Sequence, residues 1–135
     1  MKFFFPLPAA FGVCLLLAGT ALAEIVINTD RDIEYATGGV GVSEREGLDA
    51  LAPDYGLKLV FAVEGSGSFL SAVAVSISRA GEEVFRAADT GPWLLVALPV
   101  GDYRVAAESH GHIREADVRV PQTGHTEATL HFPAQ

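Results

Sequence analysis

From Leu57 to the C-terminus the sequence is a succession of short apolar segments separated by turn residues, and this pattern most constrains the fold. Val73, Val75 and Ile77 alternate with polar residues, as in a strand with one buried face. The segment WLLVAL, residues 93–98, is apolar on both faces, which is typical of a central strand. Seven such strands, with a turn about every ten residues, predict a mainly β fold, a seven-stranded antiparallel Greek-key β-sandwich.

The last two strands are expected to form a hairpin around the three-residue loop 122–124, which ends in glycine. This register pairs Val118 with Ala128 on one face. On the other face it brings Arg119 opposite Glu127. Apolar partners then meet inside and opposite charges meet outside, an agreement that a one-residue slip would destroy.

One short helix is expected before the first of these strands. Ser43, followed by Glu46 three residues later, has the spacing of a capping box. Pro53 disfavours helical geometry in the residue before it, so the helix is predicted over Ser43–Leu51. The preceding segment EIVINTDRDIEYATGG begins with β-branched residues and becomes polar, which fits either an arm or an edge strand.

The stretch GGVGVSEREG, Gly38 to Gly47, raises the question of a phosphate-binding loop. It lacks the Gly-Lys-Ser/Thr of a P-loop, and Glu44 stands where the dinucleotide fingerprint needs its third glycine. Glu44 and Glu46 would repel a phosphate, although they suit the first turn of a helix. The glycines are therefore interpreted as a flexible entry to the helix, and no cofactor is expected.

The N-terminus has the pattern of a cleavable signal peptide. Lys2 precedes an apolar run that ends in small residues, Ala21 to Ala23, so cleavage is expected after Ala23. Cys14 lies inside the apolar run, which argues against a lipid anchor. The predicted organisation is a signal peptide over 1–23, an arm and Gly-rich entry over 24–42, and the helix with its β-sandwich over 43–135, located in the periplasm.

Cleavage would leave 8 basic and 17 acidic residues, a formal charge of −9. This balance argues against nucleic acid or an anionic membrane as the partner, because both need basic patches. The cleaved chain would contain no cysteine, so its stability must come from hydrophobic burial.

The segment LPVGDY has the residues of a tyrosine corner: Pro99 and Gly101 shape the turn and Tyr103 follows. The longer stretch GPWLLVALPVGDYRVAAESHGH resembles the carboxypeptidase regulatory-like domain, a prealbumin-like (transthyretin-type) sandwich. The segment 38–78 also resembles small exported proteobacterial proteins that carry this domain. The resemblance covers about 35–132 and implies the fold and export, without an established activity.

Several patterns in the sequence resemble parts of metal sites. His112 and Glu115 have the His-x-x-Glu spacing of zinc carboxypeptidases, but residues three apart on a strand face opposite ways. His110 and His112 remain weak candidates for zinc or copper in an exposed turn. The segment NTDRDIE begins like a calcium loop but has Ile33 where glycine is needed. No metal site is therefore assigned.

The chain also lacks a Gly-x-Ser-x-Gly elbow, so the prediction is a non-enzymatic exported interaction or structural module. An alternative is a carbohydrate-binding (starch-binding-like) module, with an aromatic platform near strand ends and Trp93 packed in the core. A metal-binding periplasmic protein and a peptidase-related hydrolase are further alternatives. The platform residues are Tyr35, Tyr55 and Phe69, and the partner-binding candidates are Leu48, Leu51, Tyr55 and Tyr35.

Overall fold

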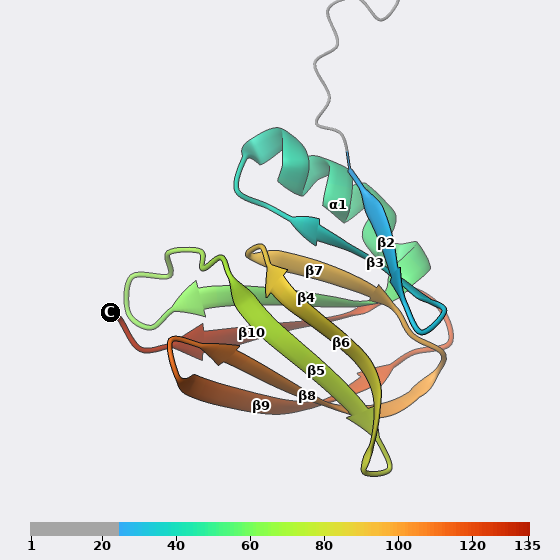
Figure 1. Ribbon diagram of the computed structural model, residues 1–135. Helices are drawn as coiled ribbons and strands as arrows, with labels where there is room; N and C mark the ends of the chain where they lie inside the picture. Colours follow the sequence, from blue (N-terminus) through green and yellow to red (C-terminus); the bar gives the residue numbers. More distant parts are fainter. Residues whose placement is uncertain (1–24) are drawn as a thin grey trace, which may run out of the picture.

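A computed structural model describes residues 25–135, which form two packed β-sheets with one helix outside them (Figure 1). The elements are β2 Ile27–Asp30, β3 Ile33–Gly38, α1 Val42–Tyr55, β4 Gly56–Val63, β5 Val73–Arg79, β6 Glu82–Thr90, β7 Trp93–Ala97, β8 Gly101–Ser109, β9 His112–Val120 and β10 Thr126–Phe132. The sheet orders are β10-β4-β7-β3-β2 and β6-β5-β8-β9. The predicted mainly β sandwich with one helix is confirmed.

The described residues contain nine strands rather than the expected seven. The two additional strands, β2 and β3, form an antiparallel hairpin that extends the five-stranded sheet beyond β7. Their turn, Arg31 and Asp32, has positive φ at both residues, as a type I′ hairpin turn requires. The segment before the helix is therefore a hairpin with β2 at the sheet edge, and its polar side chains suit that exposed position.

The predicted hairpin between the last two strands is wrong. β9 pairs with β8, whereas β10 pairs in parallel with β4, so the sandwich is not wholly antiparallel. Val118 and Leu130 still face the interior, but from opposite sheets. Alternation of apolar and polar residues determines which face of a strand is buried, but it does not determine which strand lies beside it. The same sequence pattern therefore fits both arrangements.

The core lies between the two sheets. Residues of β4 alternate between the core and the outer face of the sheet, and nearly all of them are buried. β7 lies at the centre of the five-stranded sheet and its middle residues are buried, as expected. The largest fully buried side chains in this layer include Phe61, Phe85, Phe132, Leu59 and Ile77. Burial of this apolar surface is the main stabilising term in a chain of this kind.

The helix is longer than predicted and begins differently. It spans Val42–Tyr55 with Gly41 as its N-cap, and neither Ser43 nor Glu46 forms a capping bond. Pro53 lies inside the last turn of the helix, between Ala52 and Tyr55, which are buried against the sheet. Leu48 and Ala52 pack on Leu95 in a second core on the outer face of the five-stranded sheet, below the helix in Figure 1.

The predicted signal peptide and its cleavage site lie outside the described residues. In the part of the chain that the structure describes, no helix has the length and apolar character needed for a membrane span.

Candidate functional site

The Gly-rich loop before α1 is held by a side chain of its own helix. The Glu44 carboxylate accepts hydrogen bonds from the backbone amides of Gly39 and Val40, at 2.7 and 3.0 Å. Arg45 Nη1 donates to the carbonyl oxygens of the same two residues, at 2.8 and 3.1 Å. The amides that would otherwise face an anion are therefore already bound to a carboxylate, which also repels phosphate.

The neighbouring aromatic residue, Trp93, lies half-buried on the outer face of the five-stranded sheet and not in the core between the sheets. The Lys58 ammonium lies 3.6 Å from the centre of its indole ring. A Cβ atom added to Gly39 would approach Trp93 Cγ to 2.9 Å, so the Gly-rich loop also packs closely against the indole. Contacts thus cover the ring from two sides.

Lys58 is itself almost completely buried, with a side-chain exposure of 5%. Its Nζ donates to Asp49 Oδ1 of α1 at 2.8 Å and lies 3.5 Å from Glu127 Oε1 of β10. This lysine joins the helix to two strands of the sheet. Sequence reasoning missed it, although one charged residue within the apolar strand LKLVFAV was the available signal.

An exposed apolar surface surrounds this region. Phe69 is 44% exposed, and its ring lies edge-on to Trp93 at 6.3 Å between ring centres. Arg45 Cζ lies 5.2 Å from the centre of the Phe69 ring. Val40 of the adjoining loop and Val42, the first residue of α1, are exposed. We refer to these five residues (Val40, Val42, Arg45, Phe69 and Trp93) as the Phe69 patch.

The structure does not bring the predicted platform residues together. Tyr35 faces the inter-sheet core, where its ring lies edge-on to Phe85 at 5.1 Å. Tyr55 lies under the end of α1, and Phe69 lies beside Trp93. An aromatic platform made of Tyr35, Tyr55 and Phe69 is therefore not assembled.

The predicted partner-binding residues all have contacts within the fold. Leu48 and Tyr55 are buried against the sheet, Leu51 is half-buried beside them, and Tyr35 packs on the core. Their role in binding a partner stays a prediction, but the stripe of α1 that they form is used to attach the helix.

The tyrosine corner is confirmed. The Tyr103 hydroxyl donates to the carbonyl oxygen of Pro99 at 2.7 Å, and Arg79 Nη1 donates to the hydroxyl at 3.4 Å. The corner is structural, because it ties the turn before β8 to the strand itself.

Of the histidine candidates, His110 lies in the exposed turn between β8 and β9, whereas His112 is the first residue of β9. His110 has positive φ, and its Nδ1 lies 3.2 Å from Ser109 Oγ. Within residues 25–135, no three His, Cys, Asp or Glu side chains are arranged to hold a metal ion. His110 and His112 gain no further ligand from the structure.

Two open pockets lie elsewhere on the sandwich. One of about 640 Å³ lies on the four-stranded sheet, where Arg104 pairs with Asp117 and Arg119 pairs with Asp102. The other, of about 600 Å³, lies at the C-terminal end of α1. Burial raises the pKa of Tyr55 in its lining, and the carboxylates of Glu34 and Asp54 raise it further.

The fold and these surfaces define the chain as a β-sandwich protein with an attached helix. No family model and no curated protein matches its sequence. Among solved structures, the chain is similar to 5-hydroxyisourate hydrolase from Klebsiella pneumoniae. The two sequences are 19% identical, the TM-score is 0.45, and the alignment covers 57% of this chain and 88% of the hydrolase.

This comparison corrects one expectation. The sequence predicts a chain that is not an enzyme, and this prediction is contradicted because the similar solved structure is that of a hydrolase. The similarity concerns the fold. The resemblance to the carboxypeptidase regulatory-like domain has no matching family model, so that assignment stays a prediction.

Proposed function

We propose that this chain is an exported interaction module that binds a protein partner through the Phe69 patch. The observation that carries the proposal is the position of Phe69, a large apolar side chain that is 44% exposed yet held against Trp93 and Arg45. An aromatic residue on a rigid support loses little conformational freedom on binding, and aromatic and arginine residues dominate the energetics of many interfaces.

The loop beside Phe69 supports the same proposal. Val40 and Val42 expose apolar side chains, while Glu44 and Arg45 bind the backbone of Gly39 and Val40. A surface of this kind, apolar and preformed, is complementary to an apolar surface of another protein. The glycines before α1 then serve to bring the loop against Trp93.

A carbohydrate-binding role stays an untested alternative. Sugar rings stack on the open face of an aromatic ring, whereas Lys58 and the Gly-rich loop cover Trp93. Phe69 carries the Arg45 guanidinium over its ring. The geometry of the patch therefore favours a protein partner over a glycan.

Export to the periplasm is part of the proposal. It rests on Lys2, the apolar run that follows and the small residues Ala21 to Ala23. N-terminal sequencing of the protein recovered from a periplasmic fraction tests it, and recovery of the uncleaved chain in the cytoplasm would contradict it.

Site-specific photo-crosslinking in cells tests the binding surface. A benzoylphenylalanine replaces Val42 in the patch or Val26 outside it, two valines with the same exposure of 62%. We expect a discrete crosslinked protein from position 42 that Phe69→Ser abolishes, and none from position 26. Equal crosslinking from both positions, or a product unaffected by Phe69→Ser in a variant with an unchanged circular dichroism spectrum, would refute the proposal.

A further inference from the structure

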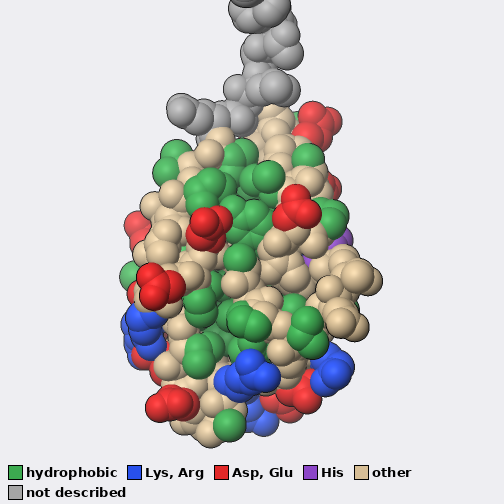
Figure 2. Space-filling model, turned by 90° about the vertical axis from the view of Figure 1, so that its right-hand side faces the viewer, with side chains coloured by type: hydrophobic (Ala, Val, Ile, Leu, Met, Phe, Trp, Pro, Cys, Tyr) green, Lys and Arg blue, Asp and Glu red, His purple; other side chains and the backbone are tan. Residues whose placement is uncertain are grey.

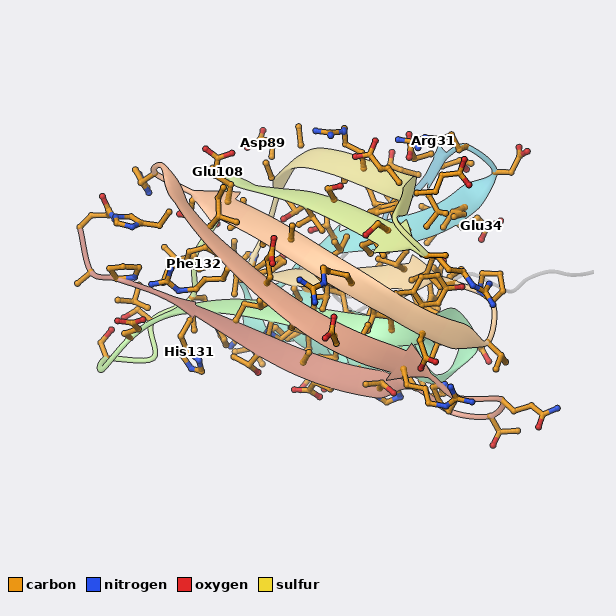
Figure 3. All side chains as sticks on the ribbon, turned by 90° about the horizontal axis from the view of Figure 1, so that it is seen from below. Arg31, Glu34, Asp89, Glu108, His131 and Phe132 are labelled. Atoms are coloured by element: carbon orange, nitrogen blue, oxygen red, sulfur yellow. The ribbon has the colours of Figure 1, made fainter. Side chains whose placement is uncertain are left out.

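Arg45 of the Phe69 patch differs from most basic residues of this acidic chain. On the face shown in Figure 2, the lysine and arginine side chains lie close to acidic ones. Arg31, labelled in Figure 3, pairs with both Asp30 and Glu83. Of the basic residues between 25 and 135, only Arg45 and Arg79 form no ion pair with a carboxylate, whereas the others all do: Arg31, Lys58, Arg86, Arg104, Arg114 and Arg119.

The two unpaired arginines differ in the aromatic ring beside them. Arg79 Cζ lies 5.3 Å from the centre of the Tyr103 ring, and Tyr103 is buried in the core. Arg45 Cζ lies at a similar distance, 5.2 Å, from the ring of Phe69, which is 44% exposed. Within residues 25–135, an unpaired guanidinium and an exposed aromatic ring therefore form one surface only at Arg45.

The loop before α1 holds the Arg45 guanidinium and leaves part of it open. Nη1 donates to the carbonyl oxygens of Gly39 and Val40, at 2.8 and 3.1 Å. Nε and Nη2 have no acceptor among residues 25–135. A guanidinium that is already oriented binds a carboxylate through parallel hydrogen bonds and loses little freedom in doing so.

A second polar group of the patch also lacks a partner. The indole Nε1 of Trp93 is buried and has no hydrogen-bond partner among residues 25–135, although a buried indole N–H usually has one. This group is a donor, like the open groups of Arg45, so an acceptor suits both. Because Nε1 lies below the surface, an acceptor reaches it only after a neighbouring side chain moves, whereas Arg45 is partly exposed.

We propose that the Phe69 patch recognises an acidic apolar segment of its protein partner. An aspartate or glutamate of the partner binds Arg45, and the apolar side chains beside it cover Phe69, Val40 and Val42. The inference rests on the proposed function, because it names the partner chemistry of the same patch. Charge complementarity carries it: covering the patch removes water from the guanidinium, and only a carboxylate compensates for that loss.

Fluorescence titration of the purified protein with short peptides tests this inference. Trp93, the one tryptophan of the chain, belongs to the patch and reports binding there. The peptides have seven residues, blocked ends and no tryptophan, and carry aspartate, glutamate, asparagine or lysine at the centre between apolar residues. The test variant is Arg45→Glu, and Arg45→Lys keeps the charge. The matched control is Arg79→Glu, which reverses the other arginine that lies over an aromatic ring without a carboxylate partner.

We expect the aspartate and glutamate peptides to bind about fivefold more tightly than the asparagine peptide, the upper end of what an exposed ion pair contributes. Arg45→Glu should invert this order in favour of the lysine peptide, whereas Arg45→Lys and Arg79→Glu should keep it. Equal binding of the acidic and asparagine peptides, or no binding of any peptide, would overturn the inference. The same change of order in Arg79→Glu would also overturn it, because the net charge of the chain would then be the cause.

Crosslinking from position 42 in cells separates this inference from the proposed function. If the Phe69-dependent product forms but the peptides show no preference for acid, only the inference on partner chemistry fails. If no product forms from position 42, the proposed function fails and this inference fails with it.

Discussion

Replacing Lys58 tests how the helix is attached to the sandwich. The lysine side chain is 5% exposed, whereas its partners Asp49 and Glu127 are 58% and 50% exposed. Lys58→Met removes the cation and keeps an unbranched stem of similar size. Asp49→Asn combined with Glu127→Gln instead leaves the ammonium buried beside Trp93 without a counter-charge.

The two perturbations should differ greatly in cost. In Lys58→Met both carboxylates return to water, and the lost hydrogen bond of about 1.5–3 kcal/mol is offset by the desolvation that the lysine no longer suffers. We expect a net change within about 1 kcal/mol. Removing both acidic partners leaves a buried unpaired charge, which costs about 3–5 kcal/mol. The same two acid substitutions in a Lys58→Met background should cost less than about 1 kcal/mol.

Urea unfolding measures these differences. Trp93 is the one tryptophan of the chain and contacts Lys58, so its fluorescence reports the attachment of the helix directly. Far-ultraviolet circular dichroism provides the second probe, because the substitutions also alter the surroundings of the indole. Asp102→Asn breaks an exposed ion pair with Arg119 and serves as the control, with an expected change below about 1 kcal/mol.

A double-mutant cycle gives the decisive quantity, the coupling between Lys58 and its two acidic partners. We expect about 3 kcal/mol. If Lys58→Met destabilises the protein as much as the loss of both acids, the reasoning from desolvation is refuted. A cost below about 1 kcal/mol for the acid double variant would equally refute it, because the lysine would then not need its partners.

Three other substitutions test parts of the fold, each by urea unfolding. Tyr103→Phe removes the bond to Pro99 and should cost about 1 kcal/mol, and an unchanged midpoint would show that the corner bond contributes nothing. Glu44→Ala frees the amides of Gly39 and Val40 and should cost about 1–2 kcal/mol, whereas Glu46→Ala, at an exposed position, should be nearly neutral. Hydrogen bonds from Ser76 and Arg86 lower the pKa of Glu83 from 4.5 to about 2. The ionised Glu83 carboxylate therefore stabilises the fold fully above about pH 4.5, and this stabilisation is lost as the pH falls through 2. The Glu83→Gln variant should lose less stability on acidification than the parent protein, and equal losses would contradict this.

Local sequence signals indicated the tyrosine corner and the helix, but not the pairing of the last two strands. The tyrosine corner depends on a bond between residues only four positions apart, so Pro99, Gly101 and Tyr103 were enough to indicate it. The existence of the helix was predicted by its apolar spacing. Its cap was not, because Glu44 reaches back to a loop whose conformation depends on packing against Trp93.

The surfaces proposed for binding could not be located from the sequence. Phe69, Arg45 and Trp93 come from three separate segments, and nothing in their spacing indicates that they meet. Leu48 and Tyr55 were expected at a partner interface because an apolar helical stripe has the same pattern whether it packs on its own sheet or on another protein.

The sequence by itself determined that this chain forms a β-sandwich, and largely which side chains fill it, because alternation with a period of two decides which face of each strand is buried. Only the tertiary structure decided which strands are neighbours. β10 lies beside β4 and not beside β9, and the hairpin of β2 and β3 completes the sheet under the helix. Alternation gives no preference among partners with equally apolar faces, so packing of the whole chain selects the neighbours and thereby the surfaces that remain open for binding.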